Sequence, residues 1–127
     1  MQPQTEVTAS LPFMRVLLVD DNLDAAEMMA ELLRELGHQV TVAHDGASAL
    51  ALTAQEAPEV ALLDIGLPVM DGYELARQLR TRYPHTKLVA ITGYGQESDR
   101  IQSRAAGFDA HLVKPVDLPA LTEALQI

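Results

Sequence analysis

Cysteine is absent from the 127 residues, and its absence excludes a disulfide framework and a thiolate metal site. Basic residues are also few: nine lysine and arginine residues against eighteen acidic ones leave a formal charge of -9. Because such a chain repels phosphate backbones, we expect no contact with nucleic acid. No apolar run approaches the roughly 18 residues of a membrane span, and no signal peptide opens the chain. We therefore expect a cytoplasmic protein without membrane contact.

The apolar content of 48% is enough for one domain with a sizeable core. Residues 1–13 are polar and interrupted by proline, so we interpret them as a flexible tail or linker and residues 14–127 as the domain. From Arg15 onward, apolar runs alternate with helical periods. The pattern predicts strands over 15–20, 39–43, 59–63, 86–91 and 109–113, and helices over 23–37, 46–57, 72–82, 97–106 and 118–126.

These alternating elements form five βα units with strands rich in Val, Leu and Ile, which predicts an α/β fold whose parallel sheet is covered on both faces. Local signals mark the helix ends. Gly37 and Gly107 are expected to terminate helices, and Asp45 and Asp71 to cap helix N-termini.

The first predicted helix carries two apolar stripes. We expect the core stripe to consist of Ala25, Met28, Met29, Leu32 and Leu36. The second stripe, which is a candidate docking face for a partner, consists of Leu23, Ala26, Ala30 and Leu33.

Polar, reactive side chains stand where the predicted strands end. Asp20 and Asp21 follow the first strand, Asp64 the third, Thr92 the fourth and Lys114 the fifth. In the common strand order 2-1-3-4-5, ligands collect outside the carboxyl ends of the strands, between the first and the third. The second strand ends in the sequence VAHDG, and we expect it to contribute nothing to this rim.

Three carboxylates without His or Cys indicate a hard oxygen site suited to Mg²⁺. Lys114 adds a positive charge and Thr92 a hydroxyl, which are the groups that phosphoryl oxygens require. An aspartate can accept a phosphoryl group covalently. Asp64 stands alone at the central strand, so we expect it to be the acceptor, while Asp20 and Asp21 hold the ion.

The segments LLVDDN, ALLDIGLPVMDGYEL, AITGYG and GFDAHLVKP resemble the receiver domains of bacterial two-component response regulators, over residues 15 to about 126. The resemblance implies a doubly wound, flavodoxin-like (βα)5 three-layer sandwich. It implies that a histidine kinase or a phosphotransfer domain phosphorylates Asp64, which switches a protein-interaction surface for a downstream target. As an enzyme, such a domain would act only on its own phosphorylation and dephosphorylation.

The same resemblance implies a role for each site residue. Asp21, Asp64 and the backbone carbonyl of Gly66 would ligate Mg²⁺, and Asp20 would contribute through a metal-bound water. Lys114 would pair with the phosphoryl group.

The resemblance also implies roles for three residues that would change position on phosphorylation or orient Lys114. Thr92 would swing towards the phosphoryl group as the switch, and the bond between Lys114 and Pro115 would be cis. His111 stands where the family usually has Tyr or Phe, and the resemblance implies that it is the second switch residue.

Other function classes fit the sequence less well. A flavin carrier would need Ser, Thr and Gly after the first strand, a dinucleotide enzyme G-x-G-x-x-G, and an aspartyl phosphatase D-x-D. The serious alternative is an interaction module that uses the receiver fold without phosphorylation. The phosphorylation site of this chain lacks none of its residues, which argues against that alternative. The chain resembles equally a free-standing regulator and a receiver from a hybrid sensor kinase, and the linker-like tail favours the latter.

Overall fold

The computed structural model describes residues 14–67, 69–93 and 104–125. Its first half contains β1 (Arg15–Val19), α2 (Leu23–Glu35), β2 (Gln39–Ala43), α3 (Gly46–Thr53) and β3 (Val60–Asp64). The second half contains α4 (Gly72–Arg82), β4 (Lys87–Thr92), β5 (Ala110–Val113) and α6 (Leu118–Leu125). The tail over residues 1–13 and most of the helix predicted over 97–106 lie outside the described residues.

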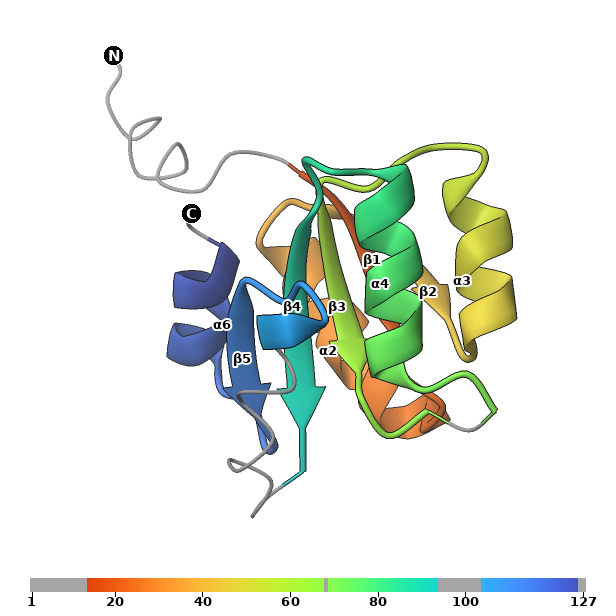
Figure 1. Cartoon of the computed structure of the whole chain (residues 1–127). Coiled ribbons are helices and arrows are strands. Elements are labelled where there is room, and N and C mark those ends of the chain that lie inside the picture. The colour runs from red at the N-terminus through yellow and green to blue at the C-terminus, as the bar shows by residue number, and fades with distance from the viewer. Residues whose placement is uncertain (1–13, 68, 94–103, 126–127) are drawn as a thin grey trace.

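The five strands form one parallel sheet in the order β2-β1-β3-β4-β5, as the sequence predicted. Figure 1 shows the sheet as the middle layer, with α3 and α4 on one face and α2 on the other. Because parallel strands share a direction, their carboxyl ends meet at one edge, where the arrowheads of β3, β4 and β5 point in Figure 1. The chain is therefore a three-layer α/β sandwich whose strand order reverses between β1 and β3.

Alternate side chains of each strand enter two separate hydrophobic clusters. Leu17 and Leu63 pack with α3 and α4, whereas Leu18 and Leu62 pack with α2 and α6. All four are almost completely buried. Both faces of β1 and β3 are thus covered, which explains their continuous apolar sequence.

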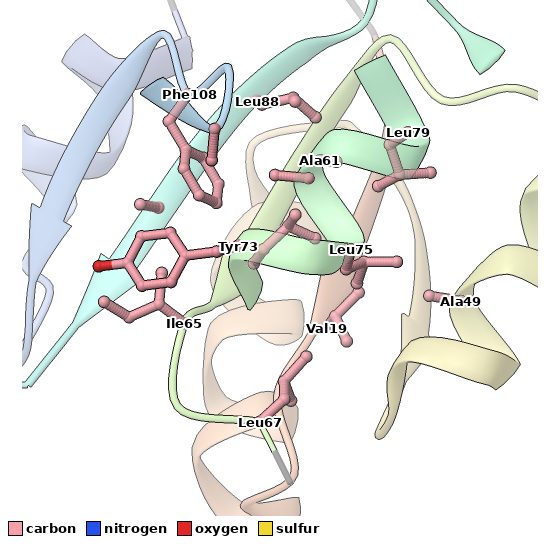
Figure 2. Packing of buried hydrophobic residues seen from close by; sticks show 14 of the residues in the cluster. Val19, Ala49, Ala61, Ile65, Leu67, Tyr73, Leu75, Leu79, Leu88 and Phe108 are labelled. Atoms are coloured by element: carbon pink, nitrogen blue, oxygen red, sulfur yellow. The ribbon is translucent and has the colours of Figure 1, made fainter. Parts of the chain in front are cut away.

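Two aromatic rings join α4 to the chain that enters β5. Tyr73 and Phe108 meet edge to face with ring centroids 6.4 Å apart, and Figure 2 shows both rings beside Ile65 and Leu88. This packing holds the first turn of α4 against the half of the sheet that contains β4 and β5.

The caps agree with the local signals. The side chains of Asp45 and Asp71 accept the backbone amides of Ser48 and Glu74. Gly37 and Gly107 have φ of 98° and 104°, a region that glycine enters without steric cost. The helix predicted over 46–57 ends earlier, at Thr53, whose carbonyl accepts the Tyr83 hydroxyl at 2.9 Å.

The orientation predicted for the first helix is correct only in part, because Met29, Leu32 and Leu36 of the predicted core stripe are half-buried and pack against the core. The residues of α2 that are buried are Ala26, Ala30 and Leu33, which belong to the stripe interpreted as a docking face. Met28, expected in the core, is 68% exposed. The small alanines face the sheet and let the helix approach it closely, so the larger methionine points outward.

Candidate functional site

Three carboxylates gather at the edge where β1 and β3 end. Asp20 follows β1, Asp64 is the last residue of the neighbouring β3, and Asp21 begins the turn into α2. One ligand atom from each of the three lies within 4.8 Å of the others. Asp20 and Asp64 are buried, whereas Asp21 is exposed, so the cluster opens to solvent on one side.

Local turns aim the two buried carboxylates. Asp20 Oδ1 accepts the amide of Asn22 at 3.0 Å, and Asp64 Oδ1 accepts the amide of Gly66 at 2.9 Å. In each side chain, Oδ1 is therefore held by an amide two residues further along, and Oδ2 faces the cluster. Asn22, and neither aspartate, caps α2, because its side chain accepts the amide of Ala25.

Lys114 brings a positive charge to this cluster from the end of β5. Its Nζ lies 3.3 Å from Asp64 Oδ2 and 3.4 Å from Asp20 Oδ2. Its backbone amide donates to the carbonyl of Thr92 at 2.8 Å, which extends the pairing of β4 with β5. The peptide bond between Lys114 and Pro115 is cis.

The electrostatics of the cluster favour an added cation. Burial raises the pKa of Asp20, and the neighbouring Asp64 carboxylate adds to the rise against the opposing effects of the Asn22 amide and Lys114. Partial burial alone would lower the pKa of Lys114, but Asp64 and Asp20 together raise it. One lysine cannot balance three carboxylates, so the oxygen donors present fit a hard divalent ion such as Mg²⁺.

Thr92 is the last residue of β4, and His111 lies within β5. Thr92 is completely buried, and its hydroxyl donates to the carbonyl of Leu112 at 3.4 Å, so it faces β5. His111 pairs with Ala90 across the sheet and is half-buried.

Gly66 and Gly72 flank the loop that follows Asp64. A Cβ on Gly66 would meet only Asp64 Oδ1, at 3.5 Å. A Cβ on Gly72 would lie 2.5 Å from Ile65 Cα and 2.7 Å from Asp64 O, so α4 can begin against the backbone of Asp64 only with glycine there. Sequence reasoning identified the cap at Asp71 but missed the adjacent glycine, for which the only signal is the motif MDG.

A cavity of about 380 Å³ lies at the opposite end of β1 and β2. The charged groups that line it, Arg15 and Glu56, pair with each other at 3.2 Å. Because these two charges balance each other, we take the carboxylate cluster, and not this cavity, as the candidate functional site. No helix of the described residues is long and apolar enough to cross a bilayer.

A family model described as response regulator receiver domain matches residues 16–126. An uncharacterised 14.6 kDa protein of Leptolyngbya boryana is 35% identical over 119 residues, which cover 92% of this chain and 91% of that protein. Response regulator MprA of Mycobacterium avium is 36% identical over 108 residues, 85% of this chain and 47% of MprA. The chain thus spans about half the length of such curated regulators.

Solved structures agree with these relatives. Chemotaxis protein CheY4 of Vibrio cholerae superposes with a TM-score of 0.85 and 30% identity, over 91% of this chain and 98% of CheY4. NtrX of Brucella abortus superposes with a TM-score of 0.84 and 28% identity, over 91% of this chain and 27% of NtrX.

Proposed function

The chain belongs to the response regulator receiver domain family, and from this premise we propose that Asp64 accepts a phosphoryl group from a phosphohistidine. Receiver domains are signalling modules of bacterial two-component systems rather than classical enzymes, and the family implies a histidine kinase or a phosphotransfer protein as the donor.

The observation that carries the proposal is the surroundings of Asp64 Oδ2. This oxygen lies 3.3 Å from Lys114 Nζ and belongs to a carboxylate whose side chain is only 13% exposed. Asp64 Oδ1 is held by the amide of Gly66, which fixes the plane of the carboxylate. A nucleophile that is oriented, charged and accessible from one side suits in-line attack on phosphorus.

In the proposed transfer, an oxygen of Asp64 attacks phosphorus while the phosphorus–nitrogen bond to the donor histidine breaks. The electron pair of that bond returns to the donor imidazole, and the product is an acyl phosphate on Asp64. Lys114 neutralises charge on the phosphoryl oxygens. Asp21, Asp64 and the carbonyl of Gly66 would hold Mg²⁺, with Asp20 contributing through a metal-bound water, and the ion would supply further neutralisation when bound.

The same residues would also serve the loss of the phosphoryl group by hydrolysis. Water attacks phosphorus, the bond to Asp64 breaks with its electron pair returning to the carboxylate, and the proton of the water leaves with the phosphate. The domain would thus catalyse only its own phosphorylation and dephosphorylation.

Thr92 and His111 are the proposed switch. In the structure the Thr92 hydroxyl faces Leu112 O, so moving it to a phosphoryl group on Asp64 would leave space beside β5. The His111 ring would take up that space, because packed interiors favour discrete arrangements. The altered surface would act on a downstream protein in the cytoplasm.

The test is phosphorylation by acetyl phosphate with Mg²⁺, followed by intact mass. The parent should gain one phosphoryl group, and Asp64→Asn should gain none. Asp45→Asn is the matched control, because Asp45 only caps α3 and asparagine caps equally well. If the parent gains nothing, the domain is an interaction module that works without phosphorylation. A full gain in Asp64→Asn would place the acceptor elsewhere.

A further inference from the structure

His44, the residue after β2, contacts the backbone of Asp20, although the sequence predicted that the end of this strand contributes nothing to the rim. His44 Nδ1 lies 3.0 Å from the backbone oxygen of Asp20. A carbonyl oxygen only accepts hydrogen bonds, so Nδ1 carries the proton and donates it. The amide of Asp20 in turn donates to the carbonyl of Ala43 at 3.1 Å. The end of β2 therefore holds both backbone polar groups of Asp20.

The imidazole continues the parallel ladder where the main chain leaves it. The register between β1 and β2 ends at Val19 and Ala43. The next main-chain donor in such a ladder would be the amide of Asp45, but Asp45 turns away to cap α3. Among the described main-chain hydrogen bonds, none reaches Asp20 O, and the side chain of His44 supplies the donor instead.

Fixing this carbonyl also fixes the peptide plane that joins Asp20 to Asp21. Because the peptide bond is planar, the direction of the Asp20 oxygen sets the orientation of the Asp21 amide and restricts the positions of the two Cα atoms that carry the side chains. That direction matters here, since the three carboxylates repel one another and the turn that bears two of them must resist the repulsion.

We propose that His44 is a positioning residue for the divalent-cation site, and that it orients the Asp20 and Asp21 carboxylates through the hydrogen bond from Nδ1 to Asp20 O. The inference rests on the proposed function, because it takes the three carboxylates to be a Mg²⁺ site. Mg²⁺ demands a nearly octahedral arrangement of oxygens, so small rotations of its ligands weaken binding. Groups that hydrogen-bond to ligands commonly control affinity in this way.

Two substitutions separate the hydrogen bond from the bulk of the side chain. His44→Asn keeps a nitrogen donor at the δ position, and His44→Leu has a similar reach without a donor. Residue 44 is exposed, so neither change should unfold the domain. Urea unfolding of each variant checks this directly.

The measurement is the Mg²⁺ dissociation constant from isothermal titration calorimetry, with the parent and both variants in the same buffer. His44→Leu should bind Mg²⁺ roughly tenfold more weakly than the parent, and His44→Asn within about twofold to threefold of it. The NMR amide signal of Asp21 without Mg²⁺ should shift in His44→Leu and stay near the parent position in His44→Asn.

The outcomes distinguish this role from the site itself. Parent-like Mg²⁺ affinity in His44→Leu, or equal weakening in both variants, would overturn the positioning role and leave the cation site intact. A parent chain that binds no Mg²⁺ would overturn the proposed cation site and the role of His44 together.

Discussion

Replacing Arg80 with methionine should destabilise the domain far more than an ordinary surface substitution. Arg80 Nη1 donates to the carbonyls of Pro84 and Thr86, and its Nη2 donates to Gly107 O and Asp109 Oδ2, all at 2.8 Å. The guanidinium therefore joins the end of α4, the connection into β4 and the connection into β5. Methionine keeps much of the length of the side chain and removes every donor.

The expected magnitude follows from these four hydrogen bonds. A hydrogen bond that involves a charged group contributes about 1.5–3 kcal/mol when it is buried. The side chains of Arg80 and Asp109 are 30% and 45% exposed, so water replaces part of what is lost. We therefore expect Arg80→Met to lower the free energy of unfolding by about 3 kcal/mol. With an unfolding entropy of roughly 0.25 kcal/mol per degree for a chain of this size, the Tm should fall by about 12 °C.

Urea and thermal unfolding followed by circular dichroism measure this loss. Arg77→Met is the matched control on the same helix, because within the described part of the chain the Arg77 guanidinium pairs only with Glu74, at 3.2 Å, and both side chains are about half exposed. Such a pair contributes less than about 0.5 kcal/mol. If the two variants unfold at the same urea concentration, the junction at Arg80 does not stabilise the fold and the reasoning fails.

Further predictions concern other parts of the chain. Gly72→Ala should displace the backbone of Asp64 and slow phosphorylation by acetyl phosphate, which intact mass would follow over time; a parent-like rate would contradict the contact. Burial lowers the pKa of His38, so below the ordinary value of about 6.5 the unfolded chain binds a proton that the folded chain does not. Stability should therefore fall as pH drops below about 6.5, and the urea midpoint of His38→Gln should fall less. Removal of residues 1–13 should leave the urea midpoint nearly unchanged, whereas a loss of several kcal/mol would show that they pack on the domain. Beryllofluoride, which mimics the phosphoryl group, should shift the NMR signals of the His111 ring, and unchanged signals would remove His111 from the switch.

The sequence by itself was sufficient for the order of elements and for the location of the chemistry. Strand and helix periods are local, and so are the caps at Asp45 and Asp71, whose side chains reach amides only three residues away. Parallel strands place their carboxyl ends at one edge whatever lies between them. The sequence therefore predicted Asp20 and Asp64 at the same edge of the sheet, and they are neighbours because β1 pairs with β3.

Tertiary structure decided what depends on contacts between distant residues. The alanines of α2 let the helix approach the sheet closely and are completely buried, whereas hydrophobic periodicity alone favoured a stripe of which Met29, Leu32 and Leu36 are only half-buried. His44 and Arg80 carry no local signal, because their partners at Asp20 and Asp109 lie 24 and 29 residues away in the chain. Such hydrogen bonds form only after the sheet has brought the loops together, because a side chain can bond only to groups within a few ångströms of it in the folded chain.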